Sequence, residues 1–296
     1  MRVLVIGGSG LVGAHVLAEA HVRGHTTLGT YRAHPVQGLE ALDLADANAT
    51  ATLLDQWHPD AVVHAAGWTW VDGCESDPAR AMRENAEQPA MLAALCAQRG
   101  IRIAYCSSSY VFDGTAGPYR EIDRPNPINA YGRSKLAGEQ AVQAAAGDLA
   151  LICRLICVWG REEQRKNFVY QVLRSIEQNQ PMRIPSDQCG NPTWAGGVAA
   201  WLLDLIEAHE KGVWHLGGPH PEWTRPQWTE AIVDGLRTAQ PSLASRISHW
   251  TYTACPTTEL GQPALRPLQA GMNCEKIQSL GARHLREPQA LDVIFR

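Results

Sequence analysis

The chain has 296 residues, 45% of them hydrophobic, and a formal net charge of -4 at pH 7. This length suits a large α/β domain with a smaller appendage, and the hydrophobic content allows a sizeable core. The mild negative charge excludes a general attraction to nucleic acid or anionic membranes. The start, MRVLVIGGSG, resembles neither a signal peptide nor a membrane span.

The strands and helices expected in the first 160 residues alternate along the chain. Strands are expected at 2–7, 26–31, 60–67, 101–108 and 149–160, and helices at 10–24, 49–59, 79–100 and from Asn129 onwards. We expect a bend at Pro89 in the third helix. Apolar runs without polar alternation, separated by helices, indicate a parallel sheet covered on both faces, which is a Rossmann-like doubly wound α/β fold.

After about residue 160 the elements become shorter, and prolines and tryptophans become denser. We expect residues 1–160 to form the dinucleotide-binding domain. Residues 161–296 are expected to form mainly a smaller substrate-binding lobe at the carboxyl edge of the sheet, with some segments returning to the core of the first domain.

The eight cysteines show no disulfide framework. They include no CxxC pair, and Cys153 and Cys157 lie four residues apart within one apolar run. We therefore expect reduced core thiols in a cytoplasmic protein. The histidines follow no pattern such as HExxH, so no metal site is expected.

The first strand is followed by GGSGLVG, which places Gly7, Gly10 and Gly13 in a GxxGxxG pattern at the start of a helix. Gly7 allows a tight turn, Gly10 lets the backbone approach a pyrophosphate, and Gly13 permits close packing of the helix. The free N–H groups and the positive dipole end of that helix face the phosphates. The pattern predicts a dinucleotide site.

The end of the second strand favours NADPH over NADH. It reads Thr30-Tyr31-Arg32, without the carboxylate that would accept from a ribose 2′-hydroxyl and with a guanidinium suited to a 2′-phosphate. Asp43 is placed to accept from the adenine amino group, although it could equally cap a helix.

The stretch NAYGRSKLAGE, from Asn129, sets Tyr131 and Lys135 one helical turn apart on the same face. Together with the glycine pattern, this pair resembles the extended short-chain dehydrogenases/reductases. More narrowly, the chain is similar to the dTDP-4-dehydrorhamnose reductase family of nucleotide-sugar 4-ketoreductases. The matching motifs are HAAGWTWVDGCE at 64–75, Asn-Ala-x-x-Pro at 85–89, SSSYVFDG at 107–114, YGxxKxxGE at 131–139, NFV at 167–169, D-Q-x-G-x-P-T at 187–193, G-x-x-H at 212–215 and Arg-Pro at 266–267.

The resemblance implies a catalytic triad of Ser108, Tyr131 and Lys135. Tyr131 would donate a proton to the substrate carbonyl as hydride arrives, and Lys135 would stabilise the phenolate and bind the nicotinamide ribose. Ser108 would stabilise the developing oxyanion. The implied cofactor-binding residues are Gly7, Ser9, Gly10, Leu11, Val12, Gly13, Tyr31, Arg32, Asp43, Leu44, Ala65, Ala66, Gly67, Tyr131 and Lys135.

The implied substrate site departs from the family at two positions. Ser109 stands where the family has an Asp, and Cys157 stands where it has a substrate-facing Trp. Reaction type is therefore better specified than the sugar. The implied substrate-binding residues are Trp68, Ser109, Val111, Phe112, Tyr131, Cys157, Asn167, Gln188, Thr193, Trp194 and Arg266.

Three functions stay open at this point. The first is NADPH-dependent reduction of a 4-keto nucleotide sugar. The second is a non-catalytic NADP-binding subunit that resembles the regulatory subunit of methionine adenosyltransferase, and the third is a reductase of another small sugar or ketone. Dehydration is disfavoured because Ser109-Tyr110 replaces the Asp-Glu pair that follows the catalytic Thr in related dehydratases. A homodimer is left open.

Overall fold

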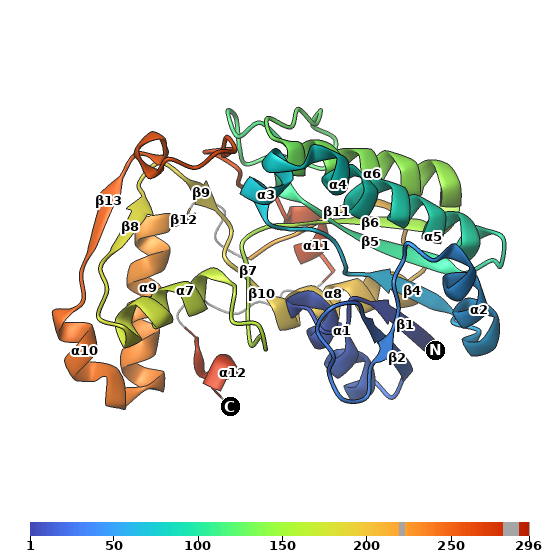
Figure 1. Cartoon of the computed structure of the whole chain (residues 1–296), viewed down its shortest axis with the longest axis horizontal. Coiled ribbons are helices and arrows are strands. Elements are labelled where there is room, and N and C mark those ends of the chain that lie inside the picture. Colours follow the sequence, from blue (N-terminus) through green and yellow to red (C-terminus); the bar gives the residue numbers. More distant parts are fainter. Residues whose placement is uncertain (219–222, 281–289, 296) are drawn as a thin grey trace.

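The computed structural model describes residues 1–218, 223–280 and 290–295, and its larger part is a seven-stranded parallel sheet between two layers of helices (Figure 1). The strand order is β11-β6-β5-β4-β1-β2-β3. The strands are β1 (Arg2–Ile6), β2 (Thr26–Tyr31), β3 (Glu40–Ala41), β4 (Ala61–His64), β5 (Arg102–Ser108), β6 (Ala150–Leu155) and β11 (Gly212–Leu216). This is the predicted Rossmann-like fold.

The strands are apolar throughout because both faces of the sheet are covered. Val3 and Val5 of β1 pack with helices α1 (Leu11–Val22) and α8 (Ala195–Glu207), whereas Leu4 and Ile6 pack against the opposite layer. That layer contains α2 (Ala47–Trp57), α5 (Gln88–Ala97) and α6 (Ala130–Ala146), and Figure 1 shows it on the other side of the sheet from α1 and α8.

Two predicted elements differ in detail from the structure. The bend at Pro89 is a π-helical turn, Arg83–Glu87, between α4 (Pro78–Met82) and α5. Because proline has no N–H, the carbonyl of Asn85 is free to accept from the Tyr105 hydroxyl at 2.6 Å. The strand predicted at 149–160 ends at Leu155, since Cys157 has a positive φ of 46° and the chain then pairs as β7 (Val158–Trp159) with β10 (Thr193–Trp194).

The smaller lobe, on the left in Figure 1, has its own apolar core. The buried rings of Trp159, Trp228 and Trp250 lie at its centre. Its elements are α7 (Phe168–Glu177), α9 (Arg225–Ala239), α10 (Ala244–His249) and α12 (Asp292–Phe295), with the strand pairs β8 (Met182–Pro185) with β13 (Tyr252–Cys255) and β9 (Cys189–Gly190) with β12 (Trp223–Thr224).

Some segments after residue 160 belong to the central sheet rather than to this lobe. Strand β11 pairs with β6, and the buried Trp201 and Trp214 pack in the core shared by the sheet, α1 and α8. The remaining short elements are α3 (Val71–Ser76), the 3-10 turns Ser109–Val111, Gly147–Leu149, Pro241–Leu243 and Thr257–Leu260, and α11 (Glu275–Gln278). Among the described residues, no helix is both long and apolar enough to cross a membrane.

Candidate active site

The predicted site residues gather at the carboxyl ends of β1, β4, β5 and β6. The sheet order reverses at β1, because the chain continues outward through β2 on one side and returns through β4 on the other. Ile6, His64 and Tyr105 are in register on adjacent strands, so the residues that follow them lie along one edge. Ligands of doubly wound sheets bind at such a reversal.

The glycine-rich turn is shaped as the sequence predicts. Gly7 has a φ of +85°, which favours glycine, and a Cβ on Gly13 would lie 2.2 Å from the Gly7 carbonyl oxygen. A Cβ on Gly10 would have its nearest neighbour at 3.4 Å, so the protein itself does not require a glycine there. Gly10 precedes the first turn of α1 and has no side-chain cap. The turn therefore leaves room for a ligand at the positive end of the helix.

The residues around this turn are placed as follows. Ser9, Leu11, Val12, Tyr31, Ala65 and Ala66 are half-buried, Gly67 is exposed, and Leu44 packs in the core below α2. Asp43 accepts from the backbone N–H of Ala45, and Asp46, not Asp43, caps α2. The alternative of a helix cap at Asp43 is therefore wrong.

Arg32 lies at the end of β2 and is exposed, but its guanidinium has a protein partner. It donates to Glu84 at 3.0 Å, and Arg80 donates to the same carboxylate at 2.8 Å. The two cations lower the pKa of Glu84 against the opposing effect of burial. A 2′-phosphate at Arg32 would have to compete with this carboxylate.

Tyr131 and Lys135 lie in the first two turns of α6, buried beside the end of β5. The Lys135 ammonium donates to the carbonyl of Cys106 at 2.7 Å and sits 4.0 Å from the centre of the Tyr105 ring. Burial lowers the pKa of Lys135 to about 8. Burial raises the pKa of Tyr131, and a hydrogen bond with the Ser108 side chain acts in the opposite direction. Ser108 and Tyr131 thus lie together, and Lys135 lies one helical turn further along α6.

Local contacts fix α6 in this position. Its N-cap Asn129 accepts from the Gly132 N–H at 2.8 Å and donates to the Leu265 carbonyl at 2.8 Å. A Cβ on Gly138 would lie 2.2 Å from the Asn85 carbonyl oxygen, so only glycine lets the helix pack this closely. The spacing of the YGxxKxxGE motif therefore serves packing as well as chemistry.

A buried ionic network behind the site was missed in the sequence analysis. Arg154 of β6 donates to both oxygens of Glu139 on α6 at 2.9 and 2.8 Å, and the Ser107 hydroxyl donates to Glu139 at 2.5 Å. Burial and the Arg154 charge lower the pKa of His215 to about 3, so its neutral ring accepts from Arg154 (3.4 Å) and donates to the Asn273 carbonyl (3.3 Å). Only the fold brings these residues from three strands and a helix together.

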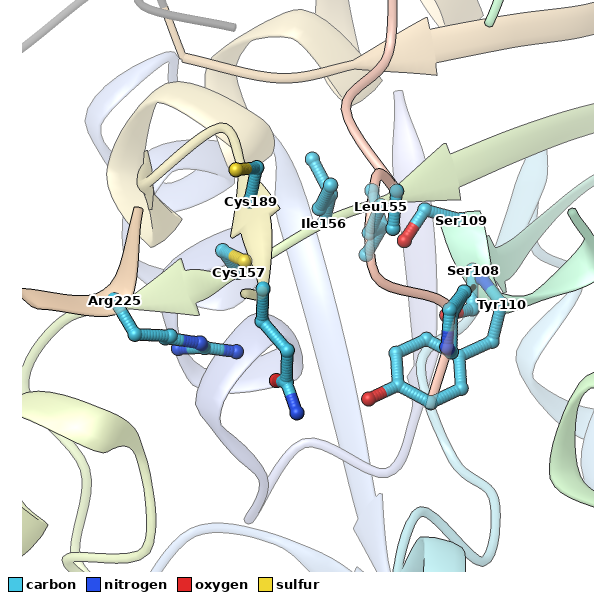
Figure 2. Close-up of a pocket in the computed structure, with 11 residues that line it drawn as sticks. Ser108, Ser109, Tyr110, Leu155, Ile156, Cys157, Cys189 and Arg225 are labelled. Carbon is cyan, nitrogen blue, oxygen red and sulfur yellow. Dashed lines mark hydrogen bonds between the residues drawn. The ribbon is translucent and has the colours of Figure 1, made fainter. Parts of the chain in front are cut away.

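A pocket opens between the end of β5 and the smaller lobe (Figure 2). Four predicted residues line it, namely Ser108, Ser109, Cys157 and Gln188. The other lining residues were not predicted, and they are Tyr110, Leu155, Ile156, Cys189, Arg225, Pro267 and Ala270. Ser108 belongs both to this pocket and to the group around Tyr131, so the two are continuous.

The other predicted substrate residues do not line the pocket. Val111 and Phe112 are completely buried, and Phe112 stacks on Tyr119 with ring centres 4.2 Å apart. Arg266 is almost buried and pairs with Asp72 at 2.7 Å. The remaining predicted side chains are half-buried or buried. The Trp68 ring has the Arg80 guanidinium 4.2 Å from its centre, and Trp194 lies beside the small lobe's core. Asn167 donates to Gly160 and Glu162, and Thr193 donates to the Asn191 carbonyl. Substrate contacts by these residues stay predictions.

The cysteines are thiols and not disulfides, as expected. Burial raises the pKa of the Cys157 thiol, which lines the pocket, and the Arg225 charge opposes that shift. Among residues 1–218, 223–280 and 290–295, no cluster of three or more metal-ligating side chains occurs.

A family model matches nearly the whole chain, and several known proteins are similar to it. Residues 1–291 match the family model described as the RmlD substrate binding domain. The chain is 37% identical to a probable low-salt glycan biosynthesis reductase, Agl14, of Haloferax volcanii, over 94% of this chain and 91% of the relative. It is 30% identical to methionine adenosyltransferase 2 subunit beta of Xenopus tropicalis, over 95% of this chain and 82% of that one.

A solved structure of a dTDP-4-dehydrorhamnose reductase of Clostridium acetobutylicum superposes with a TM-score of 0.85. It is 26% identical in sequence, and the match covers 100% of this chain and 98% of that chain.

Proposed function

The chain belongs to the RmlD substrate binding domain family, and we propose that it is an NADPH-dependent reductase that converts the 4-keto group of a nucleotide-activated sugar to an alcohol. The observation that carries the proposal is the hydrogen bond between Tyr131 and Ser108, a residue that lines the pocket, with the buried Lys135 one helical turn along α6 from Tyr131. Two of the similar proteins are named as reductases, which supports the reaction type, and one of them is named for dTDP-4-dehydrorhamnose.

The chain's residues fit a bound dinucleotide. Gly10 lacks a side chain although the protein would accommodate one, and the first turn of α1 has no side-chain cap, which together suit a pyrophosphate. NADPH would supply the hydride, and the residues of this chain that would hold it follow β1, β2 and β4. Arg32 is the residue expected to favour a 2′-phosphate.

The proposed roles of Ser108, Tyr131 and Lys135 depend on which of these groups carry a proton at neutral pH. A phenol is protonated at neutral pH, and burial raises the pKa of Tyr131 further, so the group is available as a proton donor. The Ser108 hydroxyl lies beside it and would hydrogen-bond the substrate carbonyl, stabilising the charge that develops on oxygen. Once the proton leaves, the ammonium of Lys135, one helical turn along α6, would stabilise the phenolate, because an opposite charge favours the ionised form.

The protonation state and the position of the Lys135 ammonium also matter for this chemistry. With a pKa of about 8, it is mostly protonated at neutral pH. Its bond to the Cys106 carbonyl holds the ammonium at the end of β5. The cation that we propose as the phenolate's partner is therefore already charged before the reaction starts.

The test is a turnover assay with purified protein, NADPH and a panel of 4-keto nucleotide sugars, followed at the absorbance of the reduced nicotinamide. The proposal expects oxidation of NADPH with at least one member of the panel. No oxidation with any member at high enzyme concentration would count against it.

A second candidate is a binding subunit without turnover, favoured by the similarity to methionine adenosyltransferase 2 subunit beta. Under this alternative NADPH binds and no ketone of the panel is reduced. Retention of Ser108, Tyr131 and Lys135 in one buried group supports the enzyme instead. Measuring NADPH binding alongside turnover separates the two.

A further inference from the structure

Arg225 is a cation in the pocket to which the sequence motifs give no role. It lines the pocket together with Ser108 and Tyr110. Within the described parts of the chain its guanidinium has no ion pair. Its neighbours are the rings of Phe168 and Trp228, whose centres lie 4.9 and 5.1 Å away. Aromatic faces attract a cation, but they leave its N–H donors available to a ligand.

The position of Arg225 in its helix is unfavourable for folding. It is the first residue of α9, where the helix dipole is positive, and the first turn contains no acidic residue. Cations stabilise the other end of a helix, so the dipole gives no reason for an arginine here. The same end is held at the pocket because the backbone N–H of Arg225 donates to the Gln188 carbonyl at 3.1 Å. The charge and the helix end thus make this wall of the pocket positive.

A second arginine nearby is already neutralised. Arg266 donates to Asp72 at 2.7 Å and to the Ala264 carbonyl at 2.7 Å, and its side chain is 8% exposed. Arg225 has no such carboxylate among the described residues. Burial raises the pKa of Tyr110 and of Cys157, and the positive charge of Arg225 lowers both, so it acts on groups that line the pocket. An anion that enters the pocket would meet Arg225 rather than Arg266.

We propose that Arg225 binds the diphosphate of the nucleotide sugar and so sets the distance between the anion and the reacting carbonyl. This inference rests on the proposed function. Figure 2 shows the guanidinium of Arg225 and the hydroxyl of Tyr110 directed toward one another across the pocket, with Ser108 on the Tyr110 side. In a pyranose, C1 and C4 are opposite ring atoms. A carbonyl at C4 beside Ser108 therefore places a C1 diphosphate on the far wall, where Arg225 lies. A carboxylate carried on C5 would instead lie next to the reacting C4, on the opposite side of the pocket from Arg225.

The experiment measures nucleotide binding apart from turnover. Calorimetric titration of the NADP-loaded protein with dTDP and with UDP is compared for the wild type, Arg225→Gln, Arg225→Lys and the control Arg237→Gln. Arg237 lies on the same helix but is exposed and pairs with Asp234 at 2.6 Å. Arg225→Gln should weaken nucleoside diphosphate binding about ten- to hundredfold, because a charge-assisted hydrogen bond is lost. Arg225→Lys should weaken it less, and Arg237→Gln should not change it.

Affinity for NADPH reports folding of each variant, since Arg225 is on the pocket wall away from the glycine-rich turn. Unchanged dTDP and UDP binding by a folded Arg225→Gln would overturn the inference. So would the absence of any dTDP or UDP binding in the wild type. The turnover assay tests the proposed function separately. If the wild type and Arg225→Gln both oxidise NADPH with a 4-keto nucleotide sugar at equal KM, the proposed function stands and the role of Arg225 is refuted.

Discussion

Replacing Arg154 by Met should destabilise the protein strongly, because it strips the buried Glu139 carboxylate of its charged partner. The side chains of Arg154 and Glu139 are only 4% and 6% exposed, and two of the three hydrogen bonds to the carboxylate come from the guanidinium. Removing one partner of a buried ion pair costs about 3–5 kcal/mol. At roughly 2 °C per kcal/mol for a chain of this size, the melting temperature should fall by about 6–10 °C.

The assay is thermal unfolding followed by tryptophan fluorescence, with two comparisons. Arg183→Met removes an exposed pair with Glu259, in which the side chains are 53% and 57% exposed, and should cost at most about 1 kcal/mol. The double variant Arg154→Met with Glu139→Gln should recover much of the loss, since no uncompensated charge stays buried. If Arg154→Met were no more destabilising than Arg183→Met, the reasoning about the buried network would be refuted.

Three further predictions concern the cofactor and the triad. Gly10→Ala should fold normally but bind NADPH more weakly, as measured by NADPH titration. Gly13→Ala should instead lower the melting temperature, because its Cβ would lie 2.2 Å from a backbone oxygen. Turnover should fall as the pH rises through about 8, where the Lys135 ammonium loses its proton, and Lys135→Met should be slow at every pH; a wild-type rate constant that stays level up to pH 10 would contradict this. Arg32→Ala should raise the KM for NADPH about tenfold and leave that for NADH nearly unchanged, and equal effects on both would show that Arg32 does not meet a 2′-phosphate.

Features set by local physics could be predicted from the sequence. The apolar strand runs and the glycine spacing predict the sheet and the turn after β1, because burial on two faces and a positive φ each demand particular residues. The helix that carries Tyr131 begins where predicted, at the cap residue Asn129. Four of the pocket residues, including Ser108, were also expected from the motifs.

Features that depend on distant contacts could not be predicted. The fold pairs Arg266 with Asp72, far away in sequence, and no motif indicates this partner. Arg225 carries no motif, and only the packing of α9 against the loop at Gln188 places it in the pocket. The left-handed backbone at Cys157 interrupts a run that is apolar enough to continue as a strand, so periodicity alone could not reveal the break.

The central claim is that Tyr131 delivers the proton, and Tyr131→Phe tests it most directly in a single-turnover reaction with bound NADPH and a 4-keto nucleotide sugar that the wild type reduces. Tyr131 belongs to α6 and not to the glycine-rich turn that would hold the pyrophosphate, so NADPH affinity should stay within about twofold. The rate of nicotinamide oxidation should fall by roughly 100- to 10,000-fold, the usual contribution of a general acid. A variant that binds NADPH normally and reacts at the wild-type rate would contradict the account.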